Sequence, residues 1–303
     1  MSAAYRQPPG PEWVRAWKPV VAGVREVFHA RFVDYAYPPH VHDAWTVFVV
    51  DDGWIRYDLE TRHRGAGGER VTILPPAVVH DGRAAGGHGF RKRVLYLGTD
   101  VLDERLTGRA VDHPDIRDPA LRRAVHALHR SLREPDDALE AESRLAIVAD
   151  HLRSHLAGPL ASAWEGSRAQ SGDRYPAFPA RLPAPVGGRP VGAPDRQAGQ
   201  LAGELRDLLD GRLFEPTTLA QAGSELGVSP SHLVRCFTRT FGIAPHQYVL
   251  ARRIGAARAR LLDGEPIALV AAGVGFYDQA HFNRQFKRHV GTPPGRYARS
   301  SPR

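Results

Sequence analysis

Apolar residues near the end of the chain recur at helical spacing, and a short turn interrupts their pattern. A first apolar stripe stops at Gly275, and Asp278 stands where the cap of a second helix is expected. Phe282 and Phe286 lie four residues apart in that helix, so both belong to its buried face. Its other face carries hydrogen-bond donors: Gln279, Asn283, Arg284 and Lys287. This pattern predicts a helix-turn-helix unit, whose second helix enters the major groove of DNA.

The same pattern occurs once more, 49 residues earlier. Five residues mark the offset, since Arg235, Phe237, Gly242, Pro245 and Tyr248 correspond to Arg284, Phe286, Gly291, Pro294 and Tyr297. A repeat at a fixed offset predicts two copies of one structural unit. An apolar stripe between the copies, at Leu250, Ile254, Ala257 and Leu261, predicts a connecting helix.

Between Val24 and about Leu97 the pattern changes to short runs that are typical of β-strands. The runs are VREVFHARFV, AWTVFVV, GWIRYDL, RVTILP and RKRVLYL, with turn-forming residues between them. The turn Asp51-Asp52-Gly53 separates two apolar runs and therefore predicts a hairpin. Residues 1–20 are expected to be a Pro-rich lead-in. Strands this short and this numerous predict a small barrel or jelly roll.

Two amphipathic helices are expected after the barrel, one from Asp118-Pro119 to Leu132 and one from about Asp137 to Leu156. Their apolar stripes fit two roles equally well, packing on the barrel or forming a dimer contact. Residues 158–199 contain seven Pro and seven Gly and no sustained apolar period. This composition predicts a flexible linker.

Composition supports this division of the chain. A length of 303 residues suits two domains, and the net charge of +8 is uneven. Residues 201–303 hold 14 Lys and Arg against 8 Asp and Glu, whereas the rest hold 27 against 25. Basic charge gathered in one region favours a phosphate-bearing partner. The single cysteine, Cys236, excludes an internal disulfide.

The sequence shows neither a signal-peptide pattern nor an apolar run long enough to cross a bilayer. The longest such run, Trp45 to Val50 with one Thr, is far too short. We therefore expect a cytoplasmic protein that makes no membrane contact and lies on the nucleoid when bound to DNA.

The region from about Leu201 to Tyr297 resembles the DNA-binding domain of the AraC/XylS family of transcription regulators, chiefly through GFYDQAHFNRQFKRHVGTPPGRY. Residues of about 20–98 resemble the cupin-like effector domain of such regulators, through PPHVHDAWTVFVVDDG and ILPPAVVHDGRA. The expected fold is α+β with two domains: a cupin-like barrel with following helices over 1–157, the linker over 158–199, and an all-α domain with two helix-turn-helix units over 200–303.

The resemblance implies a sequence-specific regulator that binds an operator in duplex DNA and responds to a small-molecule effector. RNA polymerase and a second copy of the chain are further expected partners. The implied base-reading residues are Ser231, Val234 and Arg235 in the first unit and Gln279, Asn283 and Arg284 in the second. Arg pairs well with guanine, and Asn or Gln with adenine. Phosphate contacts are expected from His232, Arg239, Lys287, Arg288 and the pair Arg252 and Arg253.

Polar and aromatic residues of the β-rich half are candidates for lining an effector pocket: His40, His42, Trp45, Tyr57, His80, Arg93 and Tyr96. Period-2 alternation does not fix which of them point inward. His40, His42 and His80 fall where the cupin fold places metal-binding histidines. However, Thr46 occupies the position that usually supplies a glutamate ligand. We therefore expect no cofactor and no metal, with these three histidines as the ligands if one binds.

Two other hypotheses stay open at this point. The three histidines motivate a metal-dependent cupin enzyme fused to a DNA-binding module, which a metal assay would detect. A regulator that has lost its effector would bind no ligand in thermal-shift screening. The sequence contains no nucleophile–base motif, phosphate loop or paired carboxylates, so we expect no enzymatic activity.

Overall fold

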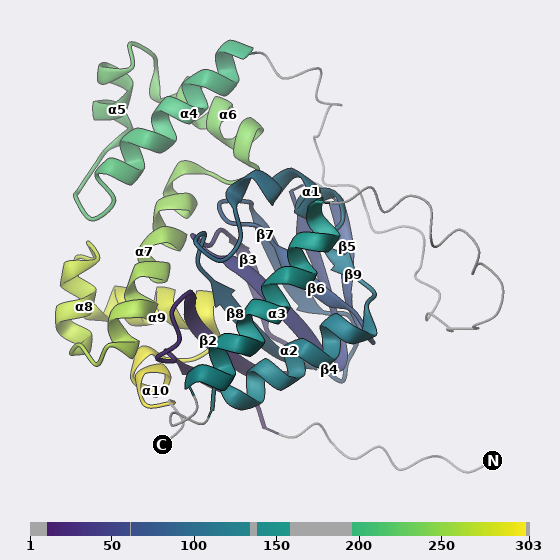
Figure 1. Ribbon diagram of the computed structural model, residues 1–303. Coiled ribbons are helices and arrows are strands. Elements are labelled where there is room, and N and C mark those ends of the chain that lie inside the picture. The colour runs from purple at the N-terminus through teal and green to yellow at the C-terminus, as the bar shows by residue number, and fades with distance from the viewer. Residues whose placement is uncertain (1–10, 61, 134–137, 158–195, 301–303) are drawn as a thin grey trace, which may run out of the picture.

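The computed structural model describes residues 11–60, 62–133, 138–157 and 196–300, and they form two parts. A β-rich part comes first in the chain and a purely helical part follows it (Figure 1). The predicted α+β fold with a cupin-like first domain and two helix-turn-helix units is therefore confirmed. Most of the predicted linker, residues 158–195, lies outside the described residues. α4 (Arg196–Gly211) begins four residues before the expected start of the helical domain at residue 200.

The β-rich part contains nine strands among the described residues, and every pair is antiparallel. One layer has the order β1 (Trp13–Trp17), β2 (Val24–Phe32), β8 (Phe90–Leu97), β4 (Trp45–Leu59), β6 (Val71–Leu74) and β9 (Asp115–Ile116). The second layer joins β3 (Ala36–His40), β7 (His80–Ala84) and β5 (Arg62–Gly67) to the far half of β4. β4 thus belongs to both layers. The expected lead-in supplies an edge strand, β1.

The predicted hairpin at Asp51-Asp52-Gly53 is wrong. β4 runs without interruption from Trp45 to Leu59, and its register against β8 shifts between Val50 and Asp52. Gly53 has a φ of +76°, and a Cβ there would lie 2.1 Å from the carbonyl oxygen of Gly89. An irregularity of this kind bends a strand sharply. The Asp-Gly turn residues therefore mark the bend at which β4 passes from one layer to the other.

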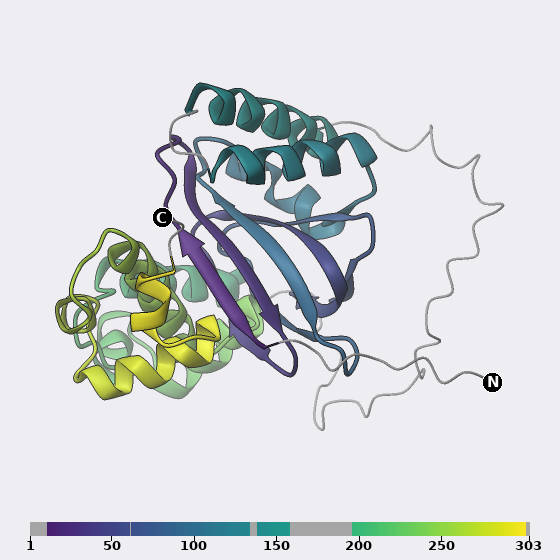
Figure 2. The same ribbon diagram turned by 90° about the horizontal axis from the view of Figure 1, so that it is seen from below.

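Alternate residues of the first layer face two different cores. Val47, Val49 and Leu95 pack against α2 (Pro119–Ser131) and α3 (Ala138–Ala157), together with the buried faces of both helices. Figure 2 shows these two helices covering one side of the sheet, with the C-terminal helices on the other side. Of the two roles considered for these apolar stripes, packing on the barrel is the one that the structure shows. η1 (Glu104–Leu106) and α1 (Thr107–Asp112) precede α2.

The C-terminal part repeats one arrangement twice. α5 (Leu219–Glu225) and α6 (Pro230–Phe241) form the first helix-turn-helix unit, and α8 (Ile267–Gly273) and α9 (Gln279–Val290) form the second. α7 (Pro245–Leu262) connects the two units, and α10 (Pro294–Ala298) follows the second. A glycine is required at position 223 of α5, because a Cβ there would lie 2.6 Å from the carbonyl oxygen of Val228. This glycine lets α5 approach the start of α6 closely.

The two parts share a hydrophobic core. Phe28 and Phe32 of β2 belong to the same buried cluster as Phe286 and Val290 of α9. Within the interface, the Arg258 guanidinium of α7 donates to the Glu26 carboxylate of β2 at 2.7 Å, and both side chains are only 9% exposed. At its rim, Lys18 pairs with Asp263 at 2.7 Å, where both side chains are about half exposed. The helical part is therefore docked on the barrel.

Candidate effector cavity and DNA-binding surface

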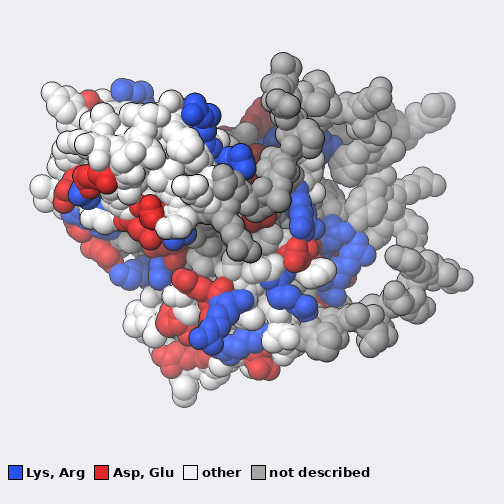
Figure 3. Space-filling model, turned by 90° about the horizontal axis from the view of Figure 1, so that it is seen from above, with Lys and Arg blue, Asp and Glu red and all other residues white. Residues whose placement is uncertain are grey.

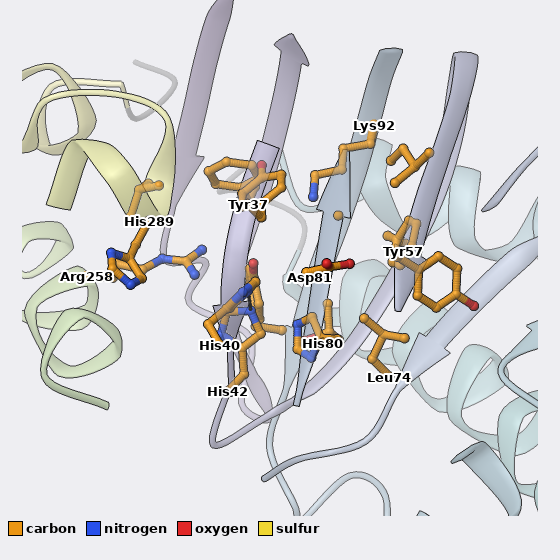
Figure 4. A pocket seen from close by; sticks show the side chains of 17 residues that line it. Tyr37, His40, His42, Tyr57, Leu74, His80, Asp81, Lys92, Arg258 and His289 are labelled. Atoms are coloured by element: carbon orange, nitrogen blue, oxygen red, sulfur yellow. Dashed lines mark hydrogen bonds between the residues drawn. The ribbon is translucent and has the colours of Figure 1, made fainter. Parts of the chain in front are cut away.

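A cavity lies inside the barrel, and both parts of the chain contribute to its wall (Figure 4). Its enclosed space is about 40 Å³. The barrel supplies residues of β2, β3, β4, β6, β7 and β8, while α7 supplies Arg258 and α9 supplies His289 and Val290. The lining combines apolar side chains, including Phe28, Phe48, Ile55 and Leu74, with several polar ones. This mixture of apolar walls and a few polar groups is typical of small-molecule sites.

Five of the seven residues predicted to line an effector pocket do line this cavity: His40, His42, Tyr57, His80 and Tyr96. Trp45 and Arg93 lie on the opposite face of the sheet. Trp45 is fully buried in the core under α2 and α3 and donates to the Leu102 carbonyl at 2.7 Å. Arg93 forms two hydrogen bonds with Asp51, of 2.8 and 2.6 Å. Their neighbours in sequence face the cavity instead, so we leave these two residues out of the proposed site.

The neighbours that face the cavity are Thr46 and Lys92. Successive side chains of a strand point to opposite faces, so an error of one residue moves a side chain across the sheet. Tyr37 and Arg258 also line the cavity and were not predicted. No local pattern identifies Arg258 as a cavity residue, because it reaches the barrel from a helix more than 150 residues away in sequence.

Hydrogen bonds fix the orientation of the three histidines of the cavity, two of them through backbone carbonyls. Nδ1 of His40 donates to the Pro38 carbonyl at 2.7 Å, and Nδ1 of His80 donates to the Val78 carbonyl at 3.0 Å. Nε2 of His40 then accepts from Nε2 of His42 at 3.2 Å. Burial lowers the pKa of His40 and His42 well below the usual range and that of His80 to about 4. All three imidazoles are therefore uncharged near neutral pH.

These histidines match a metal site in donor type but not in charge. One nitrogen from each ring lies within 4.8 Å of the others, and imidazole is a common ligand of Zn²⁺ and related ions. No carboxylate belongs to this cluster within the described part of the chain. The side chains of Lys92 and Arg258, both cationic, face the same cavity. Asp81 also lines the cavity, but it lies outside the histidine cluster and 3.6 Å from Arg83. The cluster therefore offers a dication no negative charge, and its residues do not fit a resident dication.

Protein purified without tags or added metal should therefore contain well under one metal ion per chain, as measured by elemental mass spectrometry. Replacing His40 and His42 together by Gln should leave the melting temperature and the DNA affinity nearly unchanged. Stoichiometric metal in the native protein, lost together with its stability in this double variant, would contradict the expectation and favour the metal-dependent alternative.

The residues predicted to contact DNA lie on the outer faces of α6 and α9. Ser229 caps α6 and Asp278 caps α9, each accepting a backbone hydrogen bond within the first turn. The inner faces bury Leu233, Cys236 and Phe237 in α6, and Phe282, Phe286 and Val290 in α9. The predicted contacts are exposed, apart from Val234 and Asn283, which are half-buried: Ser231, His232, Val234, Arg235, Arg239, Gln279, Asn283, Arg284, Lys287 and Arg288.

On the face that Figure 3 shows, basic charge is not gathered in one continuous patch. Seen from the side of α4 to α6, Lys and Arg form separate groups between Asp and Glu (Figure 3). Arg252 and Arg253 were also predicted to contact phosphates, but the structure shows both guanidinium groups bonded within the domain. Arg252 pairs with Asp210, and Arg253 donates to three backbone carbonyls, including that of Gly275 at 2.7 Å. The exposed cations of α6 and α9 are therefore the better candidates.

Comparison with known proteins finds a matching family model for each part of the chain. The family model described as an AraC-like ligand binding domain matches residues 23–147, and a helix-turn-helix domain model matches residues 223–300. The multiple antibiotic resistance protein MarA of Salmonella typhimurium is 30% identical over 94 residues, which cover 31% of this chain and 74% of MarA. The chain belongs to the AraC family of transcriptional regulators. This AraC-family protein is also 36% identical over 104 residues to the transcriptional regulator Rob of the same organism, covering 33% of this chain and 36% of Rob. It thus spans about a third of the length of the first curated relatives that it matches.

Its two-domain fold also has solved neighbours. ToxT from Vibrio cholerae O395 superimposes with a TM-score of 0.51 at 11% identity, covering 96% of this chain and 97% of ToxT. A structure of ToxT bound to (E)-4-(8-methylnaphthalen-1-yl)but-3-enoic acid superimposes with a TM-score of 0.50 at 11% identity, covering 96% and 98%. These likenesses concern the fold alone. Within the described residues, no helix has the length and apolar character needed to cross a bilayer.

Proposed function

We propose that this AraC-family protein regulates transcription by binding an operator through α6 and α9, under the control of a small molecule that enters the barrel cavity. The observation that carries this proposal is the composition of the cavity wall. Arg258, His289 and Val290 line the cavity and belong to the helical part, and the last two end the second recognition helix. A ligand in the cavity would thus touch the element that reads DNA.

Contacts between the barrel and α9 give this link a physical basis. The Tyr35 hydroxyl donates to the Arg288 carbonyl at 2.6 Å, near the end of α9. Phe32 packs against Gly291, the residue that ends the helix. A ligand alters an equilibrium only as far as it binds the two states with different affinity. Because the cavity wall includes residues of α7 and α9, docked and undocked arrangements would offer the ligand different contacts.

In this proposal, α6 and α9 each contribute residues that contact bases and residues that contact phosphates. Arg235 and Arg284 occupy equivalent positions of the two units and read bases, with Ser231, Val234, Gln279 and Asn283 beside them. His232, Arg239, Lys287 and Arg288 hold the phosphate backbone. Two such helices on one domain reach successive major grooves about 34 Å apart. Binding of RNA polymerase and formation of a homodimer remain predictions. Leu139 and Ile147 of α3, 75% and 52% exposed, are apolar positions at which a dimer contact would be tested first.

Replacing Arg284 by Ala should weaken specific DNA binding by about 1–3 kcal/mol and relax the preference at one base pair. The guanidinium lies on the exposed face of α9, where it can form two hydrogen bonds with one guanine. Fluorescence anisotropy measures both effects, with one duplex selected for tight binding from a random pool and one duplex of random sequence. Arg91→Ala is the matched control, because it removes the same charge from an exposed site on the barrel. An equal loss on specific and random DNA would make Arg284 a phosphate contact instead.

A further inference from the structure

Lys92 is a half-buried cation that has no counter-charge among the described residues. Its side chain extends from β8 into the cavity (Figure 4). The ammonium lies 4.2 Å from the centre of the Tyr37 ring and about 6 Å from the rings of Phe28, Phe48 and Phe90. Among the described residues, no carboxylate lies within ion-pair distance of it. Aromatic faces attract an ammonium, but they replace only part of the hydration that burial removes.

The other charged groups of the cavity wall already have partners. Arg258 is paired with Glu26 at 2.7 Å. The Asp81 carboxylate accepts from the Asp58 amide at 2.8 Å and lies 3.6 Å from Arg83. The three histidines are neutral and hydrogen-bonded as described above. Among the described residues that line the cavity, Lys92 is therefore the charged group that lacks a counter-charge.

A second observation points to a missing partner in the same place. The Tyr37 hydroxyl is buried and forms no hydrogen bond within the described part of the chain. Buried hydroxyls are almost always hydrogen-bonded, and leaving one unpaired costs free energy. The Tyr37 ring is also the group nearest to the Lys92 ammonium among the four rings around it. An unpaired donor and an unpaired cation thus stand side by side, with apolar walls around them.

We propose that the cavity takes a small monocarboxylate, whose anionic head pairs with the Lys92 ammonium and accepts from the Tyr37 hydroxyl. The proposal rests on the function proposed above, and it specifies the class of effector. The apolar rings around Lys92 suit a short hydrocarbon body, which an inorganic anion lacks. A space of about 40 Å³ has room for about three water positions, so the ligand is compact unless the wall moves.

The charge state of Lys92 gives this site a dependence on pH. Burial, with a smaller effect of the Arg258 charge, lowers the pKa of Lys92 to about 7. The neighbouring histidines have lowered pKa values and the neighbouring tyrosines raised ones. These groups therefore stay neutral between pH 7 and 9: His40, His42, His80, His289, Tyr37, Tyr57 and Tyr96. Burial raises the pKa of the Asp81 carboxyl, while Arg258, whose pKa lies well above its usual range, stays charged. Carboxylate affinity should therefore be highest below pH 7 and fall by up to about tenfold per pH unit above it.

The test compares propionate with propionamide, which has nearly the same shape and no charge, on the full-length protein by calorimetry and thermal shift. Propionate should bind at least about tenfold more tightly than propionamide. Lys92→Met should abolish this preference and leave the melting temperature of the free protein unchanged or higher, because an apolar chain replaces an uncompensated charge. Tyr37→Phe should reduce the preference without abolishing it. Lys18→Met is the matched control, since Lys18 lies at the rim of the interface and should keep the preference.

Equal affinity for propionate and propionamide, a preference that persists in Lys92→Met, or phosphate binding as tightly as propionate would each overturn the proposal. DNA binding is measured on the same samples. If salt-dependent DNA binding is present while propionate selectivity is absent, the class of effector is wrong and the proposed function stands. If DNA binding is absent as well, the proposed function fails.

Discussion

Raising the salt concentration from 50 to 200 mM should weaken the binding of the full-length protein to duplex DNA by about 10³–10⁵-fold. Each phosphate that a Lys or Arg neutralises releases condensed counterions, and six to ten such contacts give about this dependence. The exposed faces of α6 and α9 present five of these cations: Arg235, Arg239, Arg284, Lys287 and Arg288. Anisotropy titrations of a labelled duplex at several NaCl concentrations measure the slope directly.

Single variants show which residues contribute to the slope of the logarithm of the affinity against the logarithm of the salt concentration. Lys287→Ala should reduce it by about one and weaken binding to all sequences alike, because a phosphate contact carries no sequence information. Arg91→Ala, on the barrel, should leave it unchanged. A flat titration of the unaltered protein would be incompatible with DNA binding through these helices.

Replacing Glu26 by Gln should lower the free energy of unfolding by about 3–5 kcal/mol, because it leaves the Arg258 guanidinium buried without its counter-charge. The pair is 9% exposed on both sides, and Arg258 also donates to the Tyr297 hydroxyl at 3.3 Å and lies 4.5 Å from the Tyr96 ring. Urea unfolding followed by circular dichroism measures the change.

The same interface supplies a control. Lys18→Gln breaks the exposed pair with Asp263, and it should cost at most about 1 kcal/mol, since water screens such pairs. Combining Glu26→Gln with Arg258→Met removes both charges and should recover most of the loss. If the two single variants cost the same, or if the double variant is as unstable as Glu26→Gln, the buried pair does not hold the two parts together as described.

The helical part could be predicted from the sequence almost completely. The spacing of Phe282 and Phe286, the cap at Asp278 and the offset of 49 residues are local features, and helix formation depends mainly on local features of this kind. The strands after Val24 were predicted for the same reason. The hairpin at Asp51 was wrong because Asp-Gly is equally suited to a bend within one strand, and only pairing with β8 distinguishes the two.

Tertiary structure alone decided which side chains of each strand face the cavity. An apolar run such as TVFVV is buried on both faces, so alternation gives no sign of which residues face the cavity. Trp45 and Arg93 were expected there, and Thr46 and Lys92 occupy those places. Likewise, Arg258 joins the cavity only because α7 docks on β2, through contacts between residues 232 positions apart. The sequence by itself determined the two kinds of domain and the helices that are proposed to face DNA. Packing between the domains determined the composition of the cavity, since contacts so distant in sequence leave no local pattern.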